Sequence, residues 1–256
     1  MLIFGINPVI EALRAGRVLR LRVSARNDRR IDEVLALASK RKIPAERVDA
    51  LALDRATKGG VHQGVVADIE DVREYSVAEL VDLHSPIQQS RTPLIVVLDG
   101  IEDPHNAGAI LRTCDAAGVT GVIRQDRHSA ALDGVVAKAS AGALAHARIA
   151  TVVNISRAIE ELKAANVWTI GLAGEASDLY TAVDWTLPSA VVLGAEGTGL
   201  RRLVAERCDR LVRIPMMGSV DSLNVSVAAG VVLYEVVRQR CGSTGRNSVS
   251  SSLSRG

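Results

Sequence analysis

The sequence predicts an α/β protein in which a parallel β-sheet with helices on both faces follows a small α/β domain. With 256 residues, 48% of them apolar, the chain is long enough for one or two domains with their own cores. From residue 94 onward, continuous apolar runs alternate with stretches of helical periodicity, which is typical of strands buried in a parallel sheet. Before residue 72, one run alternates with period two, as a half-buried strand does.

The small domain is predicted to span residues 1–71. Asn7 and Pro8 favour the start of a helix, with Asn7 as N-cap and Pro8 at the first helical position. Four further elements are expected in this domain: a strand at 19–23, a helix from 31 to about 42, a short helix at 50–57 and a strand at 64–69.

Residues 72–93 are predicted to link the two domains, because they are mostly polar and contain Pro86 and Pro93. Within them, residues 77–81 show a short helical pattern. The larger domain is predicted to span residues 94–241, with strands at 94–98, 121–123, 167–172, 190–193 and 211–214 and a last helix from about 222 to 240. The Ser- and Gly-rich residues 242–256 are predicted to form a disordered tail, since they hold too few apolar groups to order themselves.

The cysteines and the lack of long apolar runs favour a reduced, cytoplasmic setting. Cys114, Cys208 and Cys241 are far apart, odd in number and never in a C-x-x-C pair, so neither a disulfide framework nor a metal site is indicated. The first residues lack the charged and apolar regions of a signal peptide. No apolar run approaches the roughly 20 residues that cross a membrane.

Net charge and aromatic content, taken alone, argue against a nucleic-acid partner. The formal net charge is +2 and the aromatic content is 2%, whereas RNA-reading sheets stack bases on aromatic side chains. The charge is uneven, however: residues 1–47 carry a net +6, residues 48–105 a net −7 and residues 201–256 a net +5. Of the 31 basic residues, 26 are Arg, whose guanidinium forms paired hydrogen bonds to phosphate.

Three loops that follow predicted strands contain the residues that could take part in catalysis or ligand binding. Ligands of parallel sheets bind beyond the carboxyl ends of the strands, so these loops are the place to look. The candidates in the three loops and the helices after them are Asn106, Arg112, Glu196, Ser222 and Asn224. Singly, each has an ordinary explanation as a helix cap, an exposed arginine or a solvated acid, and the glycines at 194–199 as tight turns. Those explanations do not account for the whole set at one edge of one sheet.

Three ordered motifs carry a resemblance to a known family. They are Asn106-x-Gly108-x-x-x-Arg112, Leu193-Gly194-x-Glu196-x-x-Gly199, and Ile214-Pro215-Met216-x-Gly218-x-x-x-Ser222-Leu223-Asn224-Val225-Ser226. In this order and spacing they resemble the motifs of the SpoU (TrmH-type) RNA ribose 2′-O-methyltransferases. Phe4-Gly5-Ile6-Asn7-Pro8 and Val61-His62-Gln63-Gly64 are similar to that family's small RNA substrate-binding domain, so the resemblance covers residues 2–240.

The resemblance implies properties that the residue pattern does not show. Members of the family use S-adenosylmethionine (AdoMet), need no metal, and are homodimers with a composite active site. Their catalytic domain contains a C-terminal trefoil knot. The resemblance implies a catalytic set of Asn106, Arg112, Glu196, Ser222 and Asn224. It also implies that Gly194, Ile214 and Leu223 hold the cofactor, with Ala173 and Gly174 as a further wall.

The expected reaction is methylation of a guanosine ribose in large-subunit rRNA, in the peptidyl-transferase P loop of 23S rRNA. Because an arginine stays protonated in proteins, we interpret Arg112 as a clamp for the phosphate beside the target ribose. A tRNA ribose methyltransferase and a non-enzymatic RNA-binding ribosome-assembly factor remain alternatives. A dinucleotide-dependent dehydrogenase is disfavoured, because the G-x-G-x-x-G fingerprint is missing.

Overall fold

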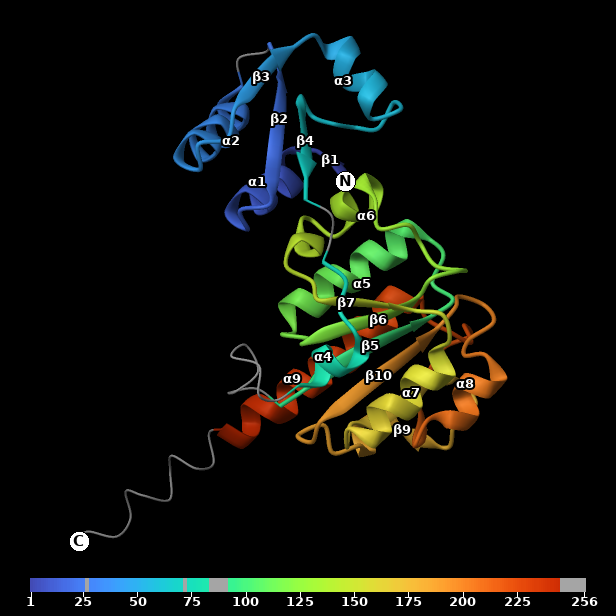
Figure 1. Ribbon diagram of the computed structural model, residues 1–256. Coiled ribbons are helices and arrows are strands. Elements are labelled where there is room, and N and C mark those ends of the chain that lie inside the picture. The colour runs from blue at the N-terminus through green and yellow to red at the C-terminus, as the bar shows by residue number, and fades with distance from the viewer. Residues whose placement is uncertain (26–27, 71–72, 83–91, 245–256) are drawn as a thin grey trace, which may run out of the picture. The chain divides into compact units, whose positions relative to one another are not determined.

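The computed structural model describes residues 1–25, 28–70, 73–82 and 92–244 (Figure 1). Residues 83–91 of the predicted linker and residues 245–256 of the predicted tail lie outside this range. The described chain forms two compact units, which we treat separately. The first contains residues 1–73, 102–115 and 130–147, and the second contains residues 74–101, 116–129 and 148 onward. The predicted α/β class with a parallel sheet is confirmed.

The first unit is built on a four-stranded sheet of order β1-β4-β2-β3, in which only β2 and β3 run parallel. Its strands are β1 (Leu2–Phe4), β2 (Val18–Ser24), β3 (Ala45–Val48) and β4 (Val65–Ile69). Its helices are α1 (Ile6–Arg14), α2 (Arg29–Lys40), α3 (Ala50–Ala56), α5 (Pro104–Ala116), α6 (Gly134–Ala139) and a 3-10 helix at Ala143–Ala145. Only the last residue of α5, Ala116, belongs to the second unit. The predicted strands at 19–23 and 64–69 are therefore confirmed, whereas β1 and β3 were not predicted.

The N-cap predicted for the first helix is wrong. α1 begins at Ile6, one residue before Asn7, and Gly5 occupies the cap position without a side-chain hydrogen bond. The backbone N–H of Ile6 donates instead to Oε1 of Gln63, 3.1 Å away, and Oδ1 of Asn7 accepts from Arg30. The two N-terminal motifs are therefore in contact, because Gln63 of the second motif accepts the hydrogen bond from the first N–H group of α1.

Residues 130–147 belong to the first unit although they come late in the chain. A Cβ added to Gly134 of α6 would lie 2.5 Å from a ring carbon of Phe4, and one added to Gly142 would lie 2.6 Å from Cβ of Glu11. The side chain of Arg17 also donates to the carbonyl of Ala145. The compact units therefore interleave along the sequence, and the boundaries predicted from the sequence stay a prediction.

The second unit is built on a seven-stranded, fully parallel sheet of order β7-β6-β5-β10-β8-β11-β9. Its strands are β5 (Leu94–Asp99), β6 (Gly121–Gln125), β7 (Ile149–Val152), β8 (Trp168–Leu172), β9 (Asp178–Leu179), β10 (Ser189–Gly194) and β11 (Arg210–Arg213). Its helices are α4 (Val77–Val81), α7 (Ile155–Ala164), α8 (Arg202–Arg207), α9 (Val225–Thr244) and a 3-10 helix at Tyr180–Ala182. The short strands β7 and β9 were not predicted. The trefoil knot stays a prediction.

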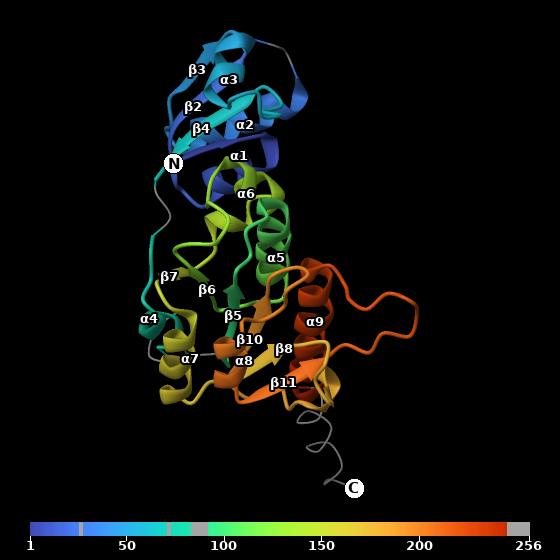
Figure 2. The ribbon, with the colours of Figure 1, turned by 90° about the vertical axis from the view of Figure 1, so that its right-hand side faces the viewer.

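Helices cover both faces of this sheet: α4, α7 and α8 lie on one face and α9 on the other (Figures 1 and 2). On the first face, Leu80 of α4 and Leu162 of α7 are fully buried in a core with Ile95 and Val97 of β5. A Cβ added to Gly121 would lie 2.9 Å from Leu80. Residues 77–81, placed in the linker by the sequence, are therefore helical as expected but form part of this core.

A partly exposed ionic contact joins the amino ends of β8 and β11. Asp209 accepts the backbone N–H and the hydroxyl of Thr169, at 2.9 and 2.8 Å, and pairs with Lys163 at 2.8 Å. Burial acts to raise the pKa of Asp209, but the hydrogen bonds from Lys163 and Thr169 outweigh it and hold this pKa below its usual range. Burial also raises the pKa of the neighbouring Cys208 thiol to about 12, so this cysteine is not a thiolate near neutral pH.

In the part of the chain that the structure describes, no helix is both long enough and apolar enough to cross a membrane. No group of three His, Cys, Asp or Glu side chains that could hold a metal ion was found among the same residues.

Candidate functional site

The glycine-rich loop after β10 is closed by its own backbone. Ala195 and Gly199 exchange two hydrogen bonds, at 3.1 and 2.8 Å, which turns residues 195–199 into a tight loop. Gly197 and Gly199 have φ angles of 81° and 68°, in the left-handed region that favours glycine. A Cβ on Gly194 would lie 2.1 Å from the carbonyl carbon of Gly199, so only glycine fits there. The loop lifts Glu196 into solvent at the carboxyl end of the strand.

The loop after β11 leads into the N-terminus of α9, and Figure 2 shows it projecting beyond that helix. α9 begins at Val225 and not near Ser222 as predicted. Oδ1 of Asn224 accepts the backbone N–H of Ser226 at 2.9 Å and its hydroxyl at 2.5 Å, which identifies Asn224 as the cap of α9. Nδ2 of Asn224 also lies 3.5 Å from Oε2 of Glu196. One asparagine thus connects the second and third motifs.

Together with the loop after β8, these two loops enclose a pocket of about 550 Å³ at the carboxyl edge of the sheet. Among the described residues, the lining comes from the ends of β8, β10 and β11, the loops after them, and the first turn of α9. The size falls within the range of about 300–1,000 Å³ that is typical of small-molecule sites. The position agrees with the rule that ligands of parallel sheets bind beyond the carboxyl ends of the strands.

All five residues that the resemblance assigns to the cofactor line this pocket: Ala173, Gly174, Gly194, Ile214 and Leu223. Glu196 and Ser222 line it as well, and Asn224 is held next to it through Glu196. Asn106 and Arg112 belong to the first compact unit, on α5. Asn106 is buried and Arg112 is exposed.

The start of α5 corrects one local expectation. Asn106 does not cap this helix, because α5 begins at Pro104 and Asn106 lies inside its first turn. The carboxylate of Asp103 accepts the backbone N–H groups of His105 and Asn106, at 3.1 and 3.3 Å. Asp103, and not Asn106, therefore caps α5.

Two features of the pocket suit a polar, flexible ligand. No backbone hydrogen bond joins residues 216–223 to other backbone groups in the described part of the chain, so their N–H and C=O groups can bind a ligand. The charged side chains in the lining are Glu175, Glu196 and Asp221 against the single Arg213, which favours a cationic ligand. Leu172 and Leu193, at the ends of two strands, supply apolar walls.

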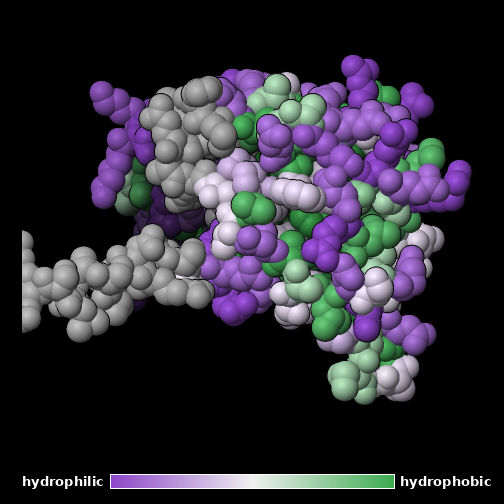
Figure 3. Space-filling model, turned by 90° about the horizontal axis from the view of Figure 1, so that it is seen from below, coloured by the Kyte–Doolittle hydropathy of each residue, from purple (hydrophilic) through white to green (hydrophobic). Residues whose placement is uncertain are grey.

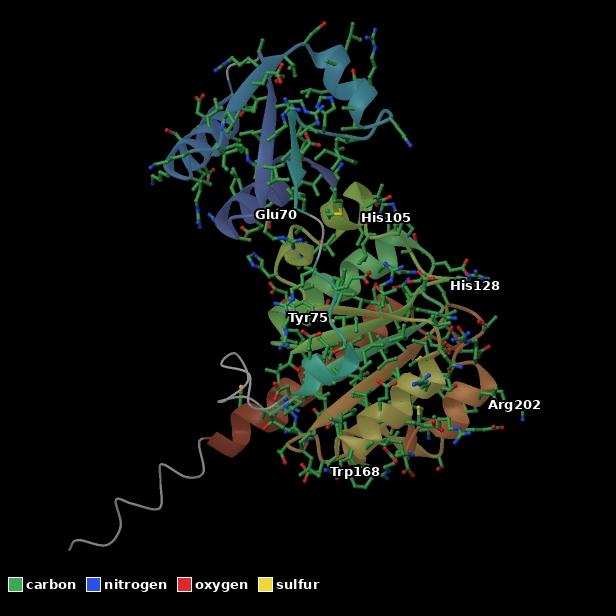
Figure 4. All side chains as sticks on the ribbon, in the orientation of Figure 1. Glu70, Tyr75, His105, His128, Trp168 and Arg202 are labelled. Atoms are coloured by element: carbon green, nitrogen blue, oxygen red, sulfur yellow. The ribbon has the colours of Figure 1, made fainter. Side chains whose placement is uncertain are left out.

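Sequence reasoning did not assign a role to Glu175, Asp221 or the two leucines. The signal for the leucines was present, because each stands at the end of a predicted strand, Leu193 in the second motif and Leu172 directly before Ala173 and Gly174. Beyond the pocket, Figure 4 shows His128 and Arg202 on the side of the sheet where β6 and β10 end, and Trp168 at the opposite, amino end of β8.

Comparison with known proteins decides the family. Residues 93–234 match the profile of the SpoU rRNA Methylase family, and residues 2–75 match a profile described as RNA 2'-O ribose methyltransferase substrate binding. The chain belongs to the SpoU rRNA Methylase family. Its relatives in that family match it along nearly their whole length.

The 23S rRNA (guanosine-2'-O-)-methyltransferase RlmB of Yersinia pestis is 43% identical over 242 residues, which are 93% of this chain and 97% of that protein. The crystal structure of the SpoU methyltransferase AviRb from Streptomyces viridochromogenes has a TM-score of 0.79 and 26% identity, covering 95% of this chain and 90% of its own. The AdoMet-bound rRNA methyltransferase from Sinorhizobium meliloti has a TM-score of 0.75 and 28% identity, covering 93% and 86%.

Proposed function

We propose that this chain transfers a methyl group from AdoMet to the ribose 2′-hydroxyl of a guanosine in the peptidyl-transferase P loop of 23S rRNA. The observation that carries the proposal is the gathering of Ala173, Gly174, Gly194, Ile214 and Leu223 around one pocket. Similarity to RlmB over 97% of that protein supports the rRNA substrate. The match of residues 2–75 to a substrate-binding profile supports a role for the N-terminal residues in holding the RNA.

The pocket fits AdoMet in size, charge and backbone. The free backbone groups of residues 216–223 and the turn at Ala173 and Gly174 would hold its polar ends, and Leu172 and Leu193 would contact its apolar parts. When bound, AdoMet would supply an electrophilic methyl group to the ribose oxygen; the carbon–sulfur bond would break toward sulfur, and the hydroxyl proton would be released to solvent. The chain accelerates this step mainly by positioning the two reactants.

Arg112 has the role of an electrostatic clamp in this proposal. Arginines in proteins are not bases, so we assign Arg112 to binding the phosphate beside the ribose and to stabilising charge that develops on the 2′-oxygen. Glu196, Ser222 and Asn224 would fix the ribose at the pocket, and Asn106 would orient groups around Arg112. The contact between Asn224 and Glu196 supports a shared task for those two residues.

The reaction is tested by mapping ribose methylation across rRNA and tRNA in a strain that lacks the protein. We expect the loss of one 2′-O-methylguanosine in the P loop of 23S rRNA, restored by the wild-type gene. Loss at a tRNA position would instead identify a tRNA methyltransferase. An unchanged methylation pattern, together with no AdoMet binding in calorimetry, would favour an RNA-binding assembly factor.

We also propose that the chain acts as a homodimer in the cytoplasm. α9 supports the dimer, because it exposes Val227 and Tyr234, one heptad apart, at 51% and 54%. The absence of disulfides between the three cysteines, all of which lie in the described part of the chain, is consistent with the cytoplasm.

The dimer proposal makes a prediction for Tyr234→Glu. A charge on the exposed face of α9 would have to be buried in the dimer, so we expect the mass measured by light scattering to fall from twice 27.1 kDa to 27.1 kDa. Trp168→Glu is the matched control, since Trp168 is 50% exposed at the opposite end of the sheet and should leave the dimer intact. Hydrophobic and hydrophilic residues are mixed on the face seen from below, as Figure 3 shows. A dimer that survives Tyr234→Glu would contradict the use of α9.

A further inference from the structure

A fully buried carboxylate lies at the carboxyl end of β5. The side chain of Asp99 is 0% exposed, and both of its oxygens accept from Arg201: one from the backbone N–H at 2.9 Å, the other from Nε at 2.7 Å. Nη2 of Arg201 completes the ion pair. A buried carboxylate is stable only when it is paired and hydrogen-bonded, so this contact fixes both residues firmly.

The Asp99–Arg201 pair fastens the loop that forms one wall of the pocket. At the start of that loop, Gly194 is paired with Asp99 in the register of β10 and β5. At its end, Arg201 returns to the same aspartate. Both ends of residues 194–201 are therefore attached to a single residue of β5. Glu196 and the glycine turn lie between these attachment points and line the pocket.

The hydrogen bonds inside this loop and the Asp99–Arg201 pair have different structural roles. The hydrogen bonds between Ala195 and Gly199 set the internal shape of the loop, whereas the Asp99–Arg201 pair sets where the loop lies on the sheet. Gly100 follows Asp99 with a φ of 78°, and a Cβ there would lie 3.5 Å from Cβ of Ala195, so β5 ends close against the loop. Without the pair, the loop would keep its internal hydrogen bonds, but its position on the sheet would no longer be fixed.

We propose that Asp99 and Arg201 are positioning residues that hold the loop at 194–200 where the pocket can bind AdoMet and Glu196 can meet the substrate. This inference rests on the proposed function, since it requires the pocket to be the AdoMet site. Asp99 and Arg201 lie outside the residues assigned to catalysis or to the cofactor. Their effect passes through the position of the loop.

The test compares three single variants with the wild-type chain. Asp99→Asn keeps the shape and one acceptor but removes the charge. Arg201→Ala removes the side-chain donors, and Arg201→Lys restores the charge without the second donor. We measure the Kd of AdoMet by calorimetry, the Tm, and the KM for AdoMet and kcat separately. Arg201→Lys keeps a cation beside the buried Asp99, so it is the variant expected to stay folded where Asp99→Asn or Arg201→Ala is too unstable to purify.

We expect Asp99→Asn and Arg201→Ala to raise the Kd and KM for AdoMet at least tenfold, and Arg201→Lys to recover part of that loss. Asp209→Asn is the matched control. Asp209 also accepts a backbone N–H and pairs with a cation, but at the amino ends of the strands, far along β8 from the pocket loops. It should lower the Tm and leave the Kd for AdoMet within twofold.

A purely structural role would lower the Tm of all these variants and leave the Kd of the folded protein unchanged, which would overturn the inference. The two proposals fail in different ways. If the wild-type chain does not bind AdoMet, the proposed function fails and this inference with it. If the wild-type chain binds AdoMet and the Arg201 variants bind it equally well, only the inference fails.

Discussion

Replacing Arg112 with alanine is expected to lower the rate of methyl transfer by about 10³-fold, the loss seen when one preorganised charge-stabilising group is removed. The exposed guanidinium of Arg112 is proposed to bind the phosphate beside the target ribose and to stabilise charge on the attacking oxygen. It does not line the pocket, so the Kd for AdoMet should stay within twofold of the wild-type value. Single-turnover kinetics with an rRNA fragment and calorimetry with AdoMet measure the two effects separately.

The matched control for Arg112→Ala is Arg157→Ala. Arg157 is also an exposed helical arginine, but it pairs with Glu161 on α7, whose buried residues face the core of the second unit. Exposed pairs of this kind contribute little to stability, so this variant should keep both activity and fold. A large loss of AdoMet affinity in Arg112→Ala would contradict the clamp role, because it would place Arg112 in cofactor binding instead.

Replacing Gly194 with alanine is expected to weaken AdoMet binding by at least about 30-fold, which corresponds to about 2 kcal/mol of strain forced on the loop. The added Cβ would lie 2.1 Å from the carbonyl carbon of Gly199, and the nearest atoms all belong to the backbone of Gly199 and Leu200, which cannot turn aside as a side chain can. The loop must therefore shift, and the wall of the pocket shifts with it. Calorimetry with AdoMet and a thermal melt report the two consequences.

Gly242→Ala serves as the control for this substitution, because nothing lies within 4 Å of its added Cβ and the residue is in the last turns of α9. It should leave the Kd for AdoMet unchanged. If Gly194→Ala binds AdoMet as tightly as the wild-type chain, the glycine loop is not part of the cofactor site.

Local patterns were enough to predict the parallel sheet and the edge of it at which the candidate residues from the loops would lie. Loops after buried strands must meet at one edge of a parallel sheet, so the order of strands and motifs already placed Glu196 and Ser222 at that edge. The short strands were missed for a physical reason. β1, β7 and β9 have two to four residues, too few to show a periodicity, and they exist because longer neighbours pair with them.

Contacts between residues far apart in the chain could not be predicted from the sequence. Asn7 is a good N-cap by local rules, but Gln63 supplies the acceptor for the start of α1 and Asn7 binds Arg30 instead. The Asp99–Arg201 pair is likewise invisible in the sequence, because either residue alone reads as an ordinary charged side chain. The low net charge and the few aromatic residues suggested no RNA partner, yet the family that the chain belongs to modifies rRNA. A ribose hydroxyl and a phosphate can be held by arginine and backbone groups, so aromatic stacking is not required.

The order of the strands has a consequence for how the chain folds as it is made. β5 is paired with β6 on one side, but its other partner is β10, whose first residue, Ser189, pairs with Leu94. About 95 residues must be synthesised between them, which at about 5–20 residues per second takes roughly 5–20 s. Until then one edge of the most apolar strand has no partner, which is a known risk for association with other chains. Two of the three pocket loops follow β10 in the chain, so the binding site forms only after the central strand pair closes.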